Sequence, residues 1–211
     1  MSDKPGIITI NHQVGSGAAY VGQKLSERLG IPFVDRQILK QVAARLTVAE
    51  AELEDREQRL QTFWQSFART AEYMTDLPLV SDKYVPSDRD LFESEAEAIR
   101  SIAEKSPAIF LGRCGGYVLR QHPRHFRLLL VADLPARIKR MGELYGLLPE
   151  AAYQALATND RERTAYIQTF TRENWLDVRL YDMCVNTTRV GLDQTVELVL
   201  ACLPSLRQPQ P

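Results

Sequence analysis

The feature that most constrains the fold of this chain is the segment IITINHQVGSGAAYVGQKLSERLG at residues 7–30. An apolar, β-branched run at 6–11 leads into a Gly-Ser-Gly turn, and an amphipathic pattern at 18–29, ended by Gly30, predicts a helix. The run IPFVD at 31–35 then predicts a second strand. Together these segments predict a β-α-β unit.

The same alternation resumes in the second half of the chain. Apolar runs there predict further strands, and amphipathic runs predict helices. The strands are expected at 107–112, 125–133 and 181–187, and the helices at 134–146, 149–170 and 192–203. Five strands alternating with helices predict an α/β fold built on a five-stranded, mainly parallel sheet.

Between the two halves lies a more polar, mostly helical stretch. Residues 75–90 carry two prolines and no clear period, which predicts a loop. We interpret residues 47–100 as a helical insertion within one domain that spans 1–211. The aromatic face of this insertion, at 63–67, could pack on the core, cover a substrate or contact a second copy of the chain, so a homo-oligomer stays open.

Composition argues against several classes of function. The 211 residues carry a net charge of −1, which gives no bulk attraction to a nucleic acid polymer or an anionic membrane. No apolar run approaches the roughly 18 residues that span a bilayer, and the polar start MSDKPG is unlike a signal peptide. The three cysteines are isolated, so neither a cysteine metal site nor a disulfide framework is predicted. We expect a soluble, cytoplasmic protein.

The glycine turn has the layout of a phosphate-binding loop. Gly15, Ser16 and Gly17 lie between a strand and a helix, where backbone N–H groups and the helix N-terminus favour an anion. A tight strand-to-helix turn can also need glycine for steric reasons alone. Phosphate binding and a purely structural turn therefore both stay open on this feature by itself.

The loop lacks the residues that usually complete such a site. A full loop carries a lysine, which neutralises the β- and γ-phosphates, and a serine or threonine, which binds Mg²⁺. This chain has Ala18, Ala19 and Tyr20 at the candidate positions. Lys24 lies more than a helical turn further on, where a solvated helix face is its expected role. Positive charge would therefore have to come from elsewhere in the chain.

Charged residues follow two of the predicted strands. Arg113 follows the third strand and precedes a pair of glycines, while Asp35 and Arg36 follow the second strand. The carboxyl ends of parallel strands form the edge where open α/β sheets bind ligands. An arginine there can hold a phosphate through its forked guanidinium. For Asp35 and Arg36, a role at the start of a following helix is an equal alternative.

Another charged cluster lies in the helix predicted at 149–170. Asp160, Arg161 and Arg163 are close in sequence, but the two arginines point about 200° apart on a straight helix. Both can reach one ligand only if the segment bends or caps a helix. Taken alone, the cluster is also compatible with an ordinary charged helix face.

In order and spacing, these clusters resemble the cytidylate kinase-like family of bacterial proteins. INHQVGSGAAYVGQKLSERLGIPFVDRQ resembles the family's loop, and LGRCGGYVLR resembles its Gly-Arg element after the third strand. The C-terminal stretch RTAYIQTFTRENWLDVRLYDMCVNTTRVGLD is the most specific match. The resemblance covers nearly the whole chain apart from the helical insertion.

The resemblance implies a three-layer P-loop kinase fold. It also implies ATP-dependent phosphoryl transfer, with Mg²⁺, to a nucleoside monophosphate or a related small phosphorylated substrate. By resemblance, Gly15 to Ala19 would hold the donor phosphates, and the charged residues after the second and third strands would lie at the acceptor. The cluster at 160–163 would be a lid segment with Asp160, Arg161 and Arg163 as catalytic residues, and its arginines would clamp the transferring phosphoryl group.

Two departures from the family pattern bear on activity. Relatives often carry an arginine where this loop has Ala19, and cytidylate kinases usually have an aspartate where this chain has Cys114. The acceptor therefore need not be CMP. Two hypotheses stay open: an active kinase that draws charge from its arginines, and a degenerate kinase that binds nucleotide or phosphate without catalysis. A dinucleotide-binding Rossmann domain fits poorly, because the required third glycine is absent.

Overall fold

A computed structural model describes residues 6–35 and 88–203 of the chain. Arg36 and residues 47–87 of the expected insertion lie outside the described residues. Their predicted roles, and the prediction of one domain over 1–211, stay predictions.

In the described part, five parallel strands form a sheet in the order β2-β3-β1-β4-β5. The strands are β1 (Ile7–His12), β2 (Phe33–Val34), β3 (Ala108–Leu111), β4 (His125–Val131) and β5 (Met183–Asn186). The predicted α/β fold is confirmed, and the described sheet is parallel throughout. Since the strands run the same way, their carboxyl ends share one edge, which carries the loop after β1.

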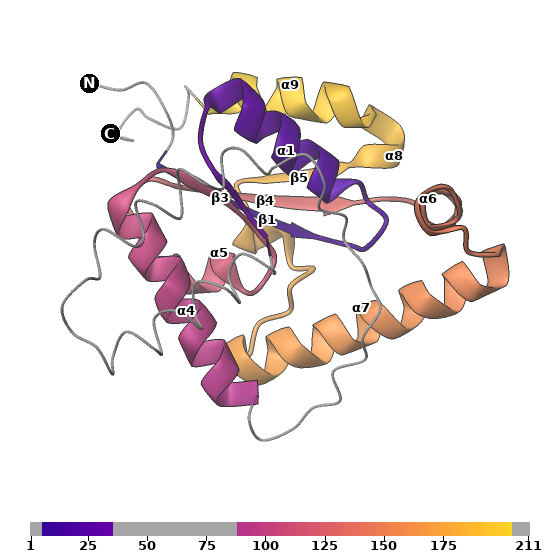
Figure 1. Cartoon of the computed structure of the whole chain (residues 1–211), viewed down its shortest axis with the longest axis horizontal. Coiled ribbons are helices and arrows are strands. Elements are labelled where there is room, and N and C mark those ends of the chain that lie inside the picture. Colours follow the sequence, from indigo (N-terminus) through magenta and orange to yellow (C-terminus); the bar gives the residue numbers. More distant parts are fainter. Residues whose placement is uncertain (1–5, 36–87, 204–211) are drawn as a thin grey trace.

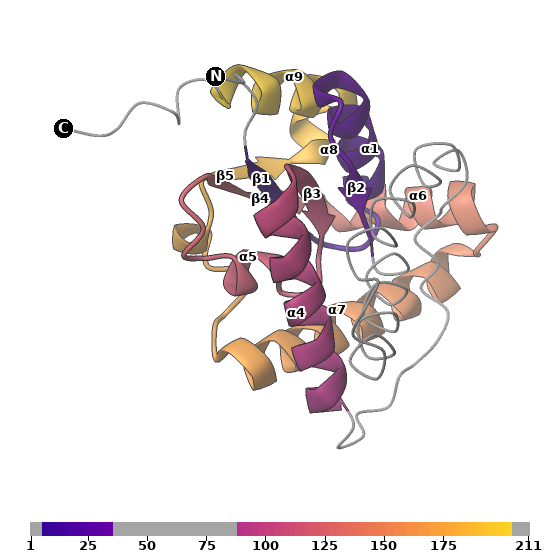
Figure 2. The same cartoon turned by 60° about the vertical axis from the view of Figure 1, so that its left-hand side comes forward.

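Helices cover both faces of this sheet, giving three layers (Figures 1 and 2). On one face lie α1 (Ala18–Leu29), α8 (Thr187–Val190) and α9 (Leu192–Cys202). On the other lie α4 (Asp88–Lys105), α5 (Gly115–Val118) and α7 (Pro149–Thr171). The helix α6 (Leu134–Tyr145) continues from the end of β4, and the short 3-10 helix η1 (Val178–Leu180) precedes β5.

The alternation of side chains along β1 builds a core on each face. Ile8 and Ile10 pack in the cluster that contains Leu25 of α1, whereas Ile7 packs in the cluster that contains Ile99 of α4. All four of these isoleucines are almost completely buried. A central strand buried on both faces reads as a continuous apolar run, which is why this strand was recognisable from sequence.

Besides shifts of one or two residues at other ends, three differences from the predicted elements have an evident reason. Residues 88–90 belong to α4, so the loop predicted at 75–90 was wrong at its end. The last strand begins at Met183 and not at 181, because Tyr181 donates its N–H to Val178 O at 3.2 Å and closes η1. The glycines after Arg113 start α5, a single helical turn too short to show a period in the sequence.

Candidate functional site

We call residues 13–17, between β1 and α1, the glycine loop. Gly15 has a φ of 77° and Gly17 a φ of 82°, in the left-handed region that glycine adopts at little cost. A Cβ on Gly15 would lie 3.1 Å from the Cα of Arg137, and one on Gly17 would lie 2.5 Å from a methyl carbon of Leu192. Both positions therefore need glycine for conformation and for space.

The carbonyl groups of this segment are all occupied: each one from His12 to Gly17 accepts a hydrogen bond. In chain order, the donors are Arg163 Nη1 (2.8 Å), Ser16 N (3.0 Å), Arg137 Nε (2.6 Å), Arg140 Nη1 (2.9 Å), Thr187 Oγ1 (2.7 Å) and Val21 N (3.1 Å). Four of these six donors are side chains from α6, α7 and α8. Helices distant in sequence thus hold the outer side of the loop.

Most N–H groups of the glycine loop, in contrast, have no hydrogen-bond partner among the described residues. Those of Val14, Gly15, Gly17 and Ala18 donate to no group in the described ranges. Gly17 is the N-cap of α1 and has no side chain to offer, and the first turn of α1 holds no acidic residue. The hydroxyl of Ser16 is buried and has no hydrogen-bond partner there either. Free donors beside a helix N-terminus form a cradle for an anion.

No side chain of the first turns of α1 replaces the missing lysine. Ala18 is buried in the core shared with α9. Tyr20 donates its hydroxyl hydrogen to Asp193 Oδ1 of α9 at 2.6 Å, which directs it away from the loop. Lys24 pairs with Glu27 at 2.8 Å on the exposed face of α1, as expected for a solvated residue.

The cationic groups against the loop come instead from α6. Arg137 is buried, with 4% of its side chain exposed, and Arg140 is partly buried. Burial lowers the pKa of Arg140 from its ordinary value, yet an arginine stays charged at pH 7. Sequence reasoning missed both residues. The signal that could have found them is the run ARIKR just after a strand, which puts two arginines on one helix face at the sheet edge.

The three residues predicted as a lid cluster do not converge on one point. Asp160 accepts from both terminal nitrogens of Arg137, each at 2.8 Å. Arg163 reaches the glycine loop and donates to its preceding carbonyl, while Arg161 is exposed. The helix α7 is continuous from Pro149 to Thr171, so the two arginines point to different sides, as the helical geometry predicts.

Arg113 lies after β3 at the carboxyl edge of the sheet, where its guanidinium forms an ion pair with Glu95 of α4. Its guanidinium carbon is also 5.4 Å from the centre of the Tyr166 ring. Arg113 and Cys114 have left-handed φ angles of 52° and 57°, a strain that clusters at functional sites. Burial raises the pKa of the Cys114 thiol to about 12, so it cannot supply the charge of an aspartate. Asp35 follows β2 and is partly buried.

His12 is a third residue that sequence reasoning missed. It ends β1 and is buried, with 5% of its surface exposed. Burial, and then the positive charge of Arg163, lowers the pKa of His12 well below its ordinary value. The imidazole is therefore neutral at pH 7, directly before the glycine loop.

A protein-family model, described as the cytidylate kinase-like family, matches residues 7–189. The chain belongs to the cytidylate kinase-like family. The matched range runs from β1 to α8, so it includes the glycine loop, Arg113 and the whole of α7. A cytidylate kinase of Methanothrix thermoacetophila is 25% identical over 203 residues, which cover 95% of this chain and 99% of the relative.

Solved structures share the fold of this family member. An uncharacterized protein from Eubacterium ventriosum superposes with a TM-score of 0.70 at 22% identity, covering 94% of this chain and 98% of that one. Shikimate kinase from Acinetobacter baumannii, in complex with shikimate, gives a TM-score of 0.52 at 14% identity, with 98% and 96% covered. A gluconokinase from Sinorhizobium meliloti gives 0.51 at 18% identity, with 96% and 93% covered. These likenesses support the P-loop kinase fold alone.

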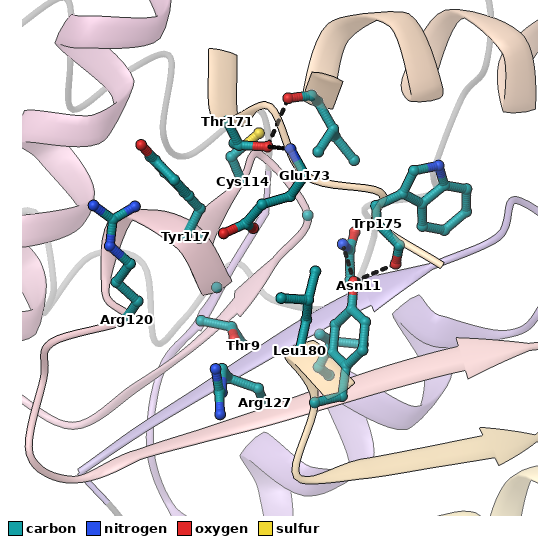
Figure 3. Close-up of a pocket in the computed structure, with 16 residues that line it drawn as sticks. Thr9, Asn11, Cys114, Tyr117, Arg120, Arg127, Thr171, Glu173, Trp175 and Leu180 are labelled. Carbon is teal, nitrogen blue, oxygen red and sulfur yellow. Dashed lines mark hydrogen bonds between the residues drawn. The ribbon is translucent and has the colours of Figure 1, made fainter. Parts of the chain in front are cut away.

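This cytidylate kinase-like protein also has a pocket of about 100 Å³, apart from the glycine loop. Figure 3 shows Tyr117 and Arg120 of the α5 region on one side of it, and Leu180 and Trp175 on the other. Its lining includes Cys114 and residues of β1. The pocket is therefore on the sheet face opposite α1, next to the turn that carries Arg113.

The described residues also bear on metal binding and on membrane insertion. Within the described ranges, no group of three or more His, Cys, Asp or Glu side chains could hold a metal ion. None of the helices described here is long and apolar enough to cross a bilayer.

Proposed function

We propose that this protein is an ATP-dependent kinase that transfers the γ-phosphoryl group to a nucleoside monophosphate or a related small phosphate acceptor. The observation that carries the proposal is the uneven hydrogen bonding of the glycine loop. Its carbonyl groups are all bonded, whereas the N–H groups of Val14, Gly15, Gly17 and Ala18 lack partners in the described part of the chain. Such a row of donors favours an oxyanion. Because the chain belongs to a kinase-like family, we expect this anion to be the phosphate chain of a nucleoside triphosphate.

On the donor side, Gly15, Ser16, Gly17, Ala18 and Ala19 would hold the β- and γ-phosphates of ATP. Ala18 and Ala19 would contribute only backbone N–H groups and the partial positive charge at the start of α1. This cradle binds phosphate oxygens but adds no full charge. The proposal therefore needs cations from other elements.

Arg161 is the proposed clamp on the transferring phosphoryl group. It is exposed, and its Nη2 donates to Thr158 Oγ1 at a long 3.4 Å. It can therefore turn without breaking a buried contact, and a clamp role requires it to swing round from the side of α7 opposite Arg163. Arg163 is less free, because it already holds the carbonyl of His12. An arginine that stabilises the charge of a transferring phosphoryl group is worth roughly 10³- to 10⁵-fold in rate.

On the acceptor side, Arg113 is the proposed phosphate ligand, with Asp35 and Arg36 beside it. β2 and β3 are paired, so the residues after them share one edge. Glu95 holds one end of the Arg113 guanidinium, while Nε has no hydrogen-bond partner among the described residues. CMP is the first acceptor to test, because the relative from Methanothrix thermoacetophila is a cytidylate kinase.

We propose that ATP occupies the cradle, and among the described residues no group of three or more His, Cys, Asp or Glu side chains could hold Mg²⁺. Tyr20, one of the three residues at the candidate positions of the missing lysine and hydroxyl, donates to Asp193. We therefore assign Mg²⁺ no protein ligand and no step. If it takes part, it arrives bound to the nucleotide phosphates and neutralises part of their charge.

A degenerate kinase that binds a nucleotide or phosphate without catalysis is the second candidate. A specific observation favours it: Arg137, Arg140 and Arg163 all donate to carbonyls of the loop region. Arginines that hold the protein backbone are less able to follow a phosphoryl group in transit. The two candidates make the same prediction for binding and opposite predictions for turnover.

The test is a nucleotide panel on the full chain. ATP binding is measured by calorimetry with and without Mg²⁺, and phosphoryl transfer is then measured to CMP, dCMP, UMP, AMP and GMP. We expect ATP binding and transfer to at least one monophosphate. Binding without turnover above background would favour the degenerate kinase. If ATP does not bind at millimolar concentration, the donor-site assignment is wrong.

A further inference from the structure

The glycine loop is attached to α6 and α7 through Arg137 and Asp160. We propose that these two form a positioning pair, in which Asp160 orients Arg137 and Arg137 orients the loop for anion binding. Asp160 would then act through Arg137 and would not touch the substrate. This inference rests on the proposed function for its ligand, and it revises the catalytic role that the sequence predicts for Asp160.

Arg137 makes three hydrogen bonds that leave it little freedom. Its Nε donates to Val14 O at 2.6 Å, and its two terminal nitrogens donate to the two carboxylate oxygens of Asp160 at 2.8 Å each. The side chain is 4% exposed, while that of Asp160 is 30% exposed. This forked geometry is specific to arginine, because its donors lie on three separate nitrogens of one plane, whereas the three donors of a lysine ammonium radiate from a single nitrogen.

Asp160 is needed because Arg137 is buried. A buried guanidinium without a carboxylate is strongly destabilising, and it would leave its site or draw in water. Asp160 lies on α7, whereas Arg137 lies on α6. Its carboxylate holds the two terminal nitrogens of Arg137, while the Nε of Arg137 donates to the loop. The aspartate is therefore a structural counter-ion of the donor cradle.

The contact with Val14 O has a direct consequence for the loop. A trans peptide unit is planar, so its C=O and the next N–H point in opposite directions. With Val14 O directed at Arg137, the N–H of Gly15 points away from α6, and it has no acceptor among the residues described. The carbonyls of His12 and Gly15, which other arginines hold, do not leave a free N–H in the same way. Their peptide units contain the N–H groups of Gln13 and Ser16, and both of these already donate within the protein.

Close packing strengthens the same link. A Cβ on Gly15 would lie 3.1 Å from the Cα, Cβ and O of Arg137, so the backbone of α6 is against the loop at this residue. The pair therefore sets the position of Gly15 and the direction of its N–H. One hydrogen bond to a charged group contributes about 1.5–3 kcal/mol, which corresponds to roughly 10- to 100-fold in affinity.

The experiment compares full-length variants Asp160→Asn, Arg137→Lys and the double variant with the wild type. Asp160→Asn keeps the shape of the side chain and removes its charge. Lys139→Ala is the matched control, because Lys139 is on the same helix but 78% exposed, in a surface pair with Glu143. Calorimetry with ATP and with pyrophosphate measures binding. Hydrogen exchange at the amide of Ser16 measures the loop in the absence of ligand, because this N–H donates to Gln13 O at 3.0 Å and closes the turn that contains Val14 and Gly15. Thermal melting checks the fold.

We expect Asp160→Asn and Arg137→Lys each to weaken ATP and pyrophosphate binding by about 10-fold or more and to speed exchange at Ser16. The double variant should be little worse than either single one, because the two residues act as a unit. Lys139→Ala should match the wild type. A directly catalytic carboxylate would instead give a lower kcat in Asp160→Asn with unchanged binding and exchange, and that result would overturn the inference.

The outcomes separate this inference from the proposed function. If the wild type binds neither ATP nor pyrophosphate, the proposed function fails, but exchange at Ser16 still decides whether the pair positions the loop. Unchanged exchange in Asp160→Asn refutes the pair in either case. If Arg137→Lys does not fold, Asp160→Asn and Asp160→Glu decide, since the second restores the charge and should recover part of the binding.

Discussion

Tyr20 of α1 donates its hydroxyl hydrogen to Asp193 of α9 at 2.6 Å, so this residue, one of three at the candidate positions of the missing lysine and hydroxyl, is directed at a neighbouring helix. The same hydrogen bond raises the pKa of Tyr20, which keeps the phenol protonated and unsuited to bind a cation. We predict that Tyr20→Phe leaves ATP affinity unchanged, both with and without Mg²⁺, by calorimetry. A loss of affinity that occurs only with Mg²⁺ would contradict this prediction.

Gly15 offers a test of the loop against a matched glycine. Gly15 and Gly146 have similar φ angles, 77° and 66°, but a Cβ at Gly146 meets nothing within 4 Å. Gly146→Ala should cost only the backbone strain, about 1–2 kcal/mol in urea unfolding. Gly15→Ala should cost more, because it also displaces α6, and it should weaken ATP binding by 10-fold or more. Equal effects of the two substitutions on ATP binding would remove Gly15 from the site.

The ion pair of Arg113 with Glu95 gives a prediction on the acceptor side. Glu95 is 1% exposed, so Glu95→Gln leaves the guanidinium without its counter-ion and should destabilise the protein by about 1–3 kcal/mol. It should also raise KM for the acceptor while ATP binding stays unchanged. The control is Glu93→Gln on the same helix, whose partner Arg89 is 79% exposed. If acceptor KM is unaltered in the Glu95 variant, Glu95 does not position Arg113 for substrate.

Substitution of Arg161 should lower activity with little effect on stability. It is exposed, and its described hydrogen bond to Thr158 is a long one. Arg161→Ala should therefore change the free energy of unfolding by less than about 0.5 kcal/mol, as is usual for surface substitutions. Turnover, measured with the acceptor found in the panel, should fall by about 10³-fold if Arg161 clamps the transferring phosphoryl group. Equal losses of turnover and stability would refute this role.

Acidification should destabilise the protein through the buried His12 and the half-buried His125. Burial lowers the pKa of His125 to about 4 and that of His12 well below its ordinary value of 6.5. Below pH 6.5 these histidines are therefore protonated in the unfolded chain but stay neutral in the folded chain. Stability is full above pH 6.5 and falls as the pH drops from about 6.5 toward 4, by roughly 3 kcal/mol at most for His125.

Urea unfolding at a series of pH values measures this dependence. His125 is also in hydrogen-bond contact with Thr9 Oγ1, at 2.7 Å through its Nε2. His125→Gln keeps a polar group for Thr9 but does not titrate, so its stability should fall less steeply between pH 6.5 and 4. His122→Gln serves as the control. A wild-type slope in the His125 variant would show that another group is responsible.

Sequence reasoning predicted the sheet, most helix positions and the place of the glycine loop, because these depend on neighbouring residues. The apolar run of β1 and the spacing of Val21 and Leu25 in α1 report burial within one turn or one strand. The boundaries failed where no periodicity exists, as in the single turn of α5. Arg113 was also placed at the correct edge, since it directly follows a strand.

Contacts between distant segments could not be predicted in the same way. Asp160 was assigned to the lid by its neighbours in sequence, whereas its partner is Arg137, 23 residues earlier on another helix. Arg113 was expected to be open to an acceptor, but α4 brings Glu95 against it. Nothing in the local pattern of either residue announces these partners, because charge pairing has no period.

The sequence by itself determined that a strand, a glycine loop and a helix follow one another, with neither a lysine nor a hydroxyl of serine or threonine to complete the site. Only the tertiary structure decided what holds that loop. β4 pairs with β1, so α6, which continues from β4, lies against the loop and directs Arg137 and Arg140 at its carbonyl groups. The free N–H of Gly15 follows from the hydrogen bond of Arg137 to Val14 O, since a peptide unit that presents its oxygen on one side presents its hydrogen on the other.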